Sequence, residues 1–163
     1  MVKLQLALIT LLSSSLYPTK TDMAKHIHTS IHINANSAAV WKVLTDFDSY
    51  PDWNPFITSL TGEVAVGNTI AIRLPSMSFK PIVLTYDKNS ELKWSGHLLF
   101  KGLFDGEHRF LLTDNGDGTT TLDHSEQFSG VLVKAFAKSL DGETKAGFNA
   151  MNDALKKRVE ELQ

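Results

Sequence analysis

The chain has 163 residues, 42% of them hydrophobic and 21% charged, which is the composition of one globular domain with a real core. The formal net charge is −2, and lysines and arginines are scattered along the sequence, so no basic cluster indicates binding to nucleic acid or to an anionic membrane. The absence of cysteine excludes disulfides and cysteine metal sites, and no apolar run approaches the roughly 20 residues of an integral membrane span.

Residues 1–22 differ in character from the rest of the chain. They contain one short apolar run, Leu4 to Leu12, behind a single lysine, which is a weak secretory signal pattern. A second interpretation is an upstream start, because the sequence MAKHIHTSIHI opens at Met23 just where the domain begins. On either interpretation residues 1–22 lie outside the fold and residues 23–163 form a single domain. A cytoplasmic location follows from the upstream start, and export follows from the signal peptide.

The domain begins with a strand and two short helices. From Lys25 to Ile33 apolar and polar residues alternate, which predicts a strand. Thr29 lies with the isoleucines on one face, and the histidines lie on the other. Asn36 caps a helix with the sequence SAAVWKVLTDF, and prolines then restrict SYPDWNPFI to a tight helical turn or an irregular loop. Six further strands are expected, separated by turn residues: Ile57–Gly62, Asn68–Leu74, Lys80–Asp87, Glu91–Phe100, Gly106–Thr113 and Thr119–Phe128.

The chain ends in a long amphipathic helix, predicted from Asp141 to Leu162 with Asp141 as its N-cap. Its apolar residues recur three or four positions apart and define the face that covers the sheet: Phe148, Met151, Leu155, Val159 and Leu162. The polar residues, Asn152 among them, are assigned to the face in water. The fold class is therefore α+β, with a seven-stranded antiparallel sheet wrapped around one long C-terminal helix.

Four segments resemble a known superfamily. They are VWKVLTDFDSYPDWNPFI (Val40 to Ile57), GLFDGEHRF (Gly102 to Phe110), HSEQFSG (His124 to Gly130) and GFNAMNDALKKR (Gly147 to Arg158). Together with the order of elements, they are similar to the START and polyketide cyclase/dehydrase (SRPBCC) superfamily, and especially to its bacterial polyketide-cyclase-like families. The resemblance implies a helix-grip fold with a cavity between sheet and helix, but the superfamily hosts carriers, cyclases, receptors and chaperone co-factors.

Strand parity places several residues on the covered face. If the hairpin around Gly116 pairs Phe110 with Leu122, His108 faces His124 and Glu126 lies on the diagonal. Gly96, in mid-strand beside them, marks a space. The earlier strands are expected to contribute Ile70, Ile72, Leu74, Ile82, Leu84 and Tyr86. The predicted ligand-binding residues are Trp53, Ile72, Leu84, Trp94, Leu98, His108, Phe110, Leu122, His124, Glu126, Phe148 and Met151.

These residues predict a domain that binds an apolar or amphipathic small molecule such as a lipid, a polyketide or an aromatic metabolite. The alternative is a cofactor-independent cyclase or dehydratase whose catalytic candidates are His108, His124 and Glu126. The same three residues also fit a ligand anchor or a purely structural polar cluster. A third class is an interaction module like the chaperone co-factors, which an exposed apolar patch would favour.

No cofactor, metal or nucleic-acid partner is expected. His26, His28 and His32 share one face of the first strand without a further spaced ligand, so a solvated face is the preferred interpretation. The sequence contains no nucleotide fingerprint, phosphate-binding glycine loop or calcium loop. A monomer and a dimer are equally compatible with the pattern.

Overall fold

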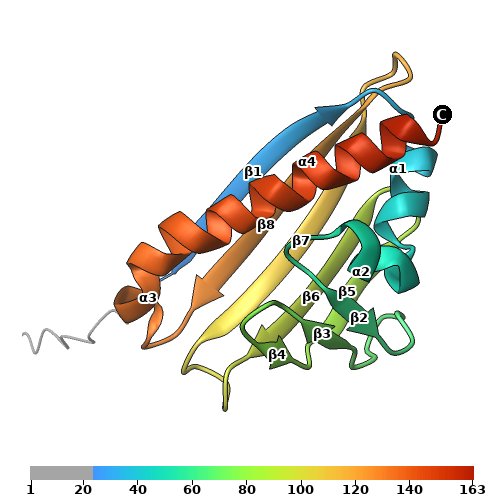
Figure 1. Cartoon of the computed structure of the whole chain (residues 1–163). Coiled ribbons are helices and arrows are strands. Elements are labelled where there is room, and N and C mark those ends of the chain that lie inside the picture. The colour runs from blue at the N-terminus through green and yellow to red at the C-terminus, as the bar shows by residue number, and fades with distance from the viewer. Residues whose placement is uncertain (1–23) are drawn as a thin grey trace, which may run out of the picture.

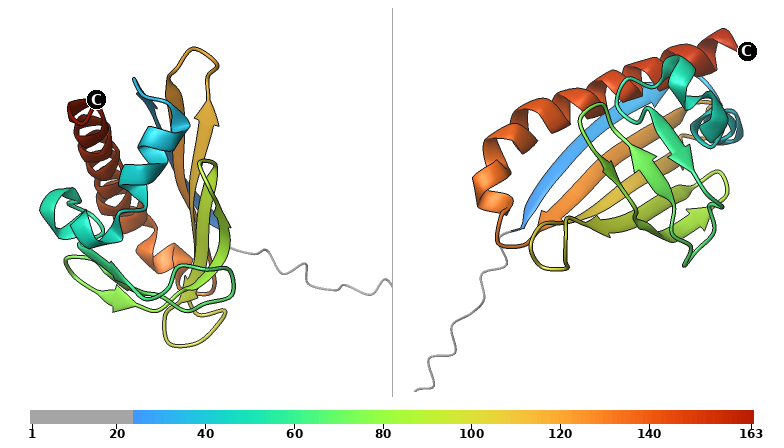
Figure 2. Two further views of the ribbon diagram at one scale, coloured as in Figure 1. Left: turned by 90° about the vertical axis from the view of Figure 1, so that its right-hand side faces the viewer. Right: turned by 60° about the horizontal axis from the view of Figure 1, so that its bottom comes forward.

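A computed structural model describes residues 24–163, in which a long C-terminal helix lies across one face of an antiparallel sheet (Figure 1). The expected leader, residues 1–22, lies outside the described residues. A smaller sheet curls over the same face of the large one, so that sheet, helix and small sheet enclose the interior from three sides (Figure 2). The α+β helix-grip class is confirmed.

The strands form two sheets rather than the expected single sheet of seven. The five-stranded sheet has the order β1-β8-β7-β6-β5, and the three-stranded sheet has the order β2-β3-β4. The strands are β1 Lys25–Ile33, β2 Ser59–Thr61, β3 Ala71–Arg73, β4 Ser78–Phe79, β5 Ile82–Asp87, β6 Glu91–His97, β7 Asp105–Asp114 and β8 Thr120–Ser129. The break comes at Pro81, which has no N–H to continue a ladder, and the isolated bridge Thr69–Ile82 joins the segment before β3 to β5.

Two short helices follow β1, as predicted. Asn36 caps α1, Ser37–Leu44, by accepting a hydrogen bond from the Ala39 amide at 3.0 Å. A 3₁₀ turn, Phe47–Ser49, leads into α2, Tyr50–Trp53. The buried Tyr50 hydroxyl donates to the Leu44 carbonyl at 2.6 Å, which fixes α2 against the end of α1.

The C-terminal helix begins earlier than predicted. An α-helix, α3, spans Val133–Ser139, a π-helical turn spans Leu140–Thr144, and α4 spans Lys145–Glu161. Asp141 is therefore not an N-cap: it lies inside the π-turn and pairs with Lys25 at 2.6 Å. Phe148, Met151, Leu155 and Val159 are buried as expected, whereas Leu162 lies beyond the helix end and is exposed.

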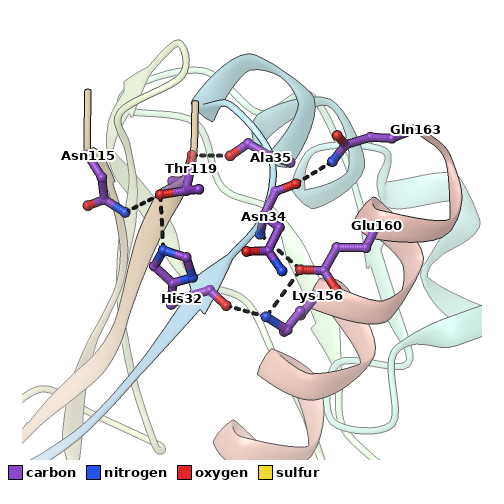
Figure 3. A network of polar contacts seen from close by, with 9 residues as sticks. His32, Asn34, Ala35, Asn115, Thr119, Lys156, Glu160 and Gln163 are labelled. Atoms are coloured by element: carbon purple, nitrogen blue, oxygen red, sulfur yellow. Dashed lines mark hydrogen bonds and ion pairs between the residues drawn. The ribbon is translucent and has the colours of Figure 1, made fainter. Parts of the chain in front are cut away.

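Asn152 lies on the buried face of α4, contrary to its assignment to the face in water. It follows Phe148 by four residues, so the helical period places both on one face. The C-terminal half of α4 is tied to the end of β1 by side-chain hydrogen bonds (Figure 3). Lys156 donates to the His32 carbonyl at 2.6 Å, and Glu160 accepts from the Asn34 amide at 2.9 Å.

The register of β7 and β8 differs by two residues from the expected one. Phe110 pairs with His124, and His108 pairs with Glu126. The cause is the connecting loop, which is longer than the tight turn assumed around Gly116, since the last pair is Asp114 with Thr120. Because the side-chain period of a strand is two, this shift leaves every side chain on its predicted face.

Strand β5 departs from the predicted alternation. Its buried residue is Val83, while Ile82 and Leu84 are exposed. A register irregularity between Val83 and Thr85 then returns Tyr86 to the inner face, where its ring packs on Trp41 with centroids 5.4 Å apart. On the small sheet's side Ile70 and Ile72 are buried as expected, and Leu74 is partly buried.

Candidate functional site

A chain of hydrogen-bonded polar side chains crosses the interior from β1 to the C-terminal half of β8. His108 and His124, from neighbouring strands, approach to 2.9 Å between their Nε2 atoms. His108 Nδ1 lies 3.3 Å from Glu126 Oε2, and His124 Nδ1 lies 2.9 Å from Asn152 Oδ1. Thr29 completes the chain. The sequence predicted the histidines and Glu126 as one cluster, and the structure brings them together.

The direction of each hydrogen bond in this chain can be assigned by starting from Thr29. The Thr29 hydroxyl donates to the His124 carbonyl at 3.2 Å, so its oxygen accepts from Asn152 Nδ2 at 2.9 Å. The Asn152 carbonyl oxygen is then left to accept from His124 Nδ1–H. A neutral His124 with its proton on Nδ1 must accept at Nε2. Each group in the chain thus assigns the donor and acceptor roles of the next.

The same reasoning continues to Glu126. His108 Nε2–H donates to His124, and a neutral His108 then offers Nδ1 as an acceptor. Glu126 Oε2 supplies the matching hydrogen only when the carboxyl is protonated. The contact between Glu126 and His108 is therefore a hydrogen bond between neutral groups rather than an ion pair.

Burial supports this protonation pattern. Loss of hydration lowers the pKa of His108 to about 3. It also lowers the pKa of His124 well below 6.5, and the neighbouring His108 adds to the effect. Burial raises the pKa of Glu126 from 4.5 to about 8. At neutral pH both imidazoles are uncharged and the carboxyl holds its proton, as the hydrogen-bond directions require.

Aromatic rings enclose both histidines. The His108 ring stacks on Trp94 with centroids 4.8 Å apart and planes 5° from parallel. The His124 ring stacks on Phe148, from α4, with centroids 3.9 Å apart. Phe110 packs against both imidazoles. These contacts fill the region between the sheet and α4 at the level of the histidines.

The space predicted at Gly96 is occupied. A side chain there would meet Pro81 and Phe79, which fold over it from the small sheet. Two open hollows lie elsewhere on the described residues. One, of about 650 Å³, runs along the small sheet between Thr58 and Lys80, and the other, of about 510 Å³, lies beside Trp41.

Glu126 is the end of the polar chain that reaches water. Its side chain retains 15% exposure, whereas the histidines and Asn152 are almost completely buried. Only Oε2 is hydrogen-bonded within the described residues, and Oε1 occupies the place that a side chain on Gly106 would take, 2.5 Å from that Cβ position. Gly106 therefore leaves room for the carboxyl on the inner face.

The remaining predicted site residues divide into two groups. Ile72, Leu122 and Met151 are fully buried in the core with Trp94 and Phe110. Trp53 is partly buried, packs edge-on against Tyr50 and donates to Ser49 at 3.2 Å. Leu84 and Leu98 are more than a third exposed, so the structure does not bring them to the histidines.

Sequence reasoning missed three polar residues. Asn152 could have been found from its four-residue spacing to Phe148, and Thr29 was placed on the inner face without a role. Asn54 is buried, and its Nδ2 is the buried side-chain polar atom without a partner among residues 24–163. Its Oδ1 accepts from the amides of Phe56 and Ile57, which shapes the loop after α2.

The described residues contain no cluster of three side chains suited to a metal ion. The face of histidines on β1 is hydrogen-bonded instead to its neighbour β8. His28 contacts Asp123 at 3.0 Å, and His32 contacts Thr119 at 3.0 Å. Within residues 24–163, no helix is both long and apolar enough to span a membrane.

Comparison with known proteins supports the fold. A family model described as polyketide cyclase / dehydrase and lipid transport matches residues 24–160. No curated protein matches the sequence. A solved START superfamily protein from Mycobacterium smegmatis is 21% identical with a TM-score of 0.64, and the match covers 85% of this chain and 99% of that one.

Two solved enzymes have the same fold. A point mutant of norcoclaurine synthase from Thalictrum flavum, in complex with a transition-state analogue, is 18% identical with a TM-score of 0.68, over 86% of this chain and 97% of that one. The Zhui aromatase/cyclase from Streptomyces sp. R1128 is 13% identical with a TM-score of 0.68, over 84% of this chain and 94% of that one. At these identities the likeness is one of fold.

Proposed function

Because the chain belongs to the polyketide cyclase/dehydrase and lipid transport family, we propose that it binds an apolar or amphipathic small molecule between the large sheet and α4. Glu126 would hold the polar end of this ligand. The observation that carries the proposal is the carboxyl itself, which lies at the edge of an apolar wall with Oε1 free of protein hydrogen bonds among the described residues. Sites for such ligands are mostly apolar with a few placed polar groups.

Ligand binding next to His124 requires the Phe148 ring to move. Its ring covers His124 and in turn packs edge-on against Phe56, with centroids 5.2 Å apart. Phe56 belongs to the loop after α2 and is only partly buried. A ligand that displaced these two rings would lie against the His108 and His124 rings, with Glu126 at one end. The aromatic pair would then be the gate of the site.

The protonated carboxyl favours a second candidate, an enzyme that transfers protons to a carbonyl substrate. Burial raises the pKa of Glu126 to about 8, so near neutral pH the group is a carboxylic acid able to donate. In this reaction Glu126 gives its proton to the substrate's carbonyl oxygen, and the carboxylate left behind takes a proton from the adjacent carbon. Neutral His108 accepts at Nδ1 from the protonated carboxyl, so this hydrogen bond would be lost when Glu126 gives up its proton and regained when the proton returns.

Titration of the full chain with N-phenylnaphthylamine, a neutral apolar fluorophore, tests the site. Phe148→Ala should strengthen its uptake with one-to-one saturation, because the substitution opens space beside the His108 and His124 rings. Phe100→Ser, which removes an exposed apolar side chain, is the matched control and should change nothing. Uptake that is lost in Phe100→Ser and unchanged in Phe148→Ala would show that the probe adsorbs to the surface.

Glu126→Gln then separates the three roles of the carboxyl. An anchor would show weaker binding of ligands that bear a hydroxyl or carbonyl, by about tenfold for each 1.4 kcal/mol lost. A catalyst would keep binding and lose turnover of a carbonyl substrate. If neither binding nor turnover changes, Glu126 is only a structural member of the polar chain.

A further inference from the structure

Large apolar side chains stand in water at one end of the molecule. They belong to the β6–β7 and β8–α3 connections, which lie next to each other in Figures 1 and 2. Leu99 is 81% exposed, Phe100 is 62% exposed and Val131 is 72% exposed. With the less exposed Leu98 and Phe136 they form what we call the apolar tip: Leu98, Leu99, Phe100, Val131 and Phe136.

Backbone contacts hold the two connections together as one surface. The Val131 amide donates to the Gly102 carbonyl at 3.2 Å, and the Leu132 amide donates to the Leu103 carbonyl at 3.0 Å. This approach requires a glycine at Gly130, which has a φ of 116° and whose Cβ would lie 2.7 Å from the Leu103 oxygen. The apolar tip is therefore built from two segments locked side by side.

An aromatic cluster contacts the apolar tip through Phe136. Phe104 packs between Phe128 and Phe136, with both centroid distances 5.3 Å. Leu99 has a φ of 64°, a conformation that costs energy for a residue with a branched side chain. The side chain is nevertheless exposed, so the hydrophobic effect does not offset the energy of this backbone conformation. A bound partner that covers the leucine would offset it.

Three lysines accompany the apolar tip. Lys101 follows Phe100, and Lys134 and Lys138 lie four residues apart on one side of α3, the side opposite Phe136. All three are exposed, and the ion pairs found among the described residues involve other lysines. Of the nearby acids, Asp141 pairs with Lys25, Asp105 accepts from the Gly102 amide and Glu143 accepts from the Ser139 hydroxyl. The tip therefore combines apolar side chains with three exposed lysines.

This combination selects among possible occupants. A second copy of the chain, docked about a two-fold axis, would bring the same lysines of both copies together, and like charges would oppose it. An anionic lipid surface accepts both features, because acyl chains receive the apolar residues while phosphate groups attract the lysines. We propose that the apolar tip docks the protein on the surface of an anionic membrane. Lys101 is brought to the same end of the molecule as Lys134 and Lys138 only in the folded chain, by the pairing of the two connections.

Sedimentation of the full chain with lipid vesicles tests the proposal. Vesicles of phosphatidylcholine with phosphatidylserine should bind the protein, and vesicles of phosphatidylcholine alone should bind it much less. The double variant Leu99→Gly, Phe100→Ser should lose most of this binding, since glycine suits the φ of 64° and the fold is kept. Val66→Ser, at a side chain 65% exposed in the β2–β3 connection, is the matched apolar control and should bind like wild type.

Charge is tested separately. Each of Lys101→Gln, Lys134→Gln and Lys138→Gln should weaken binding to the anionic vesicles by about fivefold. Lys88→Gln, in the exposed β5–β6 turn, is the control and should have no such effect.

Three outcomes would overturn the proposal. The first is an absence of binding to either vesicle. The second is binding that persists in the Leu99→Gly, Phe100→Ser variant, which would assign it to another part of the chain. The third is a dimer or a complex with a protein partner that the same variant disperses while vesicle binding is unchanged. That result would identify the apolar tip as a protein interface.

Discussion

Replacing Glu126 by glutamine should change how the stability of the protein depends on pH. The pKa of this carboxyl is about 8 in the folded chain against an ordinary 4.5. Between these values the folded state binds a proton that the unfolded state does not. The stability from this group is fully present below about pH 4.5 and is lost as the pH rises to about 8, at about 1.4 kcal/mol per pH unit.

His108 and His124 act in the opposite direction. Burial lowers the pKa of both below the ordinary 6.5, to about 3 for His108. Below pH 6.5 the unfolded chain therefore binds protons at these residues that the folded chain excludes, and stability rises with pH up to that point. With Glu126 included, these three groups make the protein most stable near pH 6.5. From there to pH 8 the ionisation of Glu126 should cost about 2 kcal/mol, and the two histidines, whose protons leave the unfolded chain over the same interval, should offset about 1 kcal/mol of it.

Glu126→Gln tests this directly, because glutamine donates to His108 Nδ1 as the protonated acid does but does not ionise. Urea unfolding at pH 6.5 and pH 8 should show the variant gaining about 2 kcal/mol relative to wild type over that interval. Glu107→Gln, which removes an exposed carboxylate from the neighbouring strand β7, should leave the difference unchanged. Parallel losses in wild type and Glu126→Gln would refute the protonated carboxyl.

Further substitutions probe the packing and the hydrogen-bond directions. Asn152→Leu should remove the acceptor that keeps the His124 proton on Nδ1. Nitrogen NMR should then show a mixture of the two imidazole tautomers in place of one. Gly106→Ala should displace the neighbouring carboxyl and destabilise the fold by about 1–3 kcal/mol in urea unfolding. Phe148→Ala should cost about 3–5 kcal/mol in the same measurement, since its ring is fully buried. Protein that starts at Met23 should melt at the temperature of the full chain, and a clear drop would place residues 1–22 in the fold.

Local periodicity was enough to predict the buried faces of β7, β8 and α4. Alternation along β7 and β8 placed His108, His124 and Glu126 inward, and that assignment survived a register error of two residues because the strand period is two. The spacing of Phe148, Met151 and Leu155 likewise identified the covered face of α4. These are properties of neighbours in sequence, which the chain carries wherever it folds.

Contacts between distant segments were decided only by the tertiary structure. A polar residue such as Asn152 reads as solvent-facing until His124 and Thr29 offer it partners from two strands, since a buried amide is tolerated only when hydrogen-bonded. The space at Gly96 was closed by Pro81 and Phe79, whose approach depends on the separate small sheet.

The charge of the apolar tip was hidden for the same reason. Composition counts lysines along the chain, and by that measure they are scattered. The pairing of the Gly102–Leu103 and Val131–Leu132 backbones places Lys101 at the same end of the molecule as α3. Sequence alone therefore predicted which way the side chains of β7, β8 and most of α4 face, because that depends on local geometry, but not Asn152 or the face of β5. Which side chains meet depends on the register of strands and the path of loops, and only the folded chain decided it.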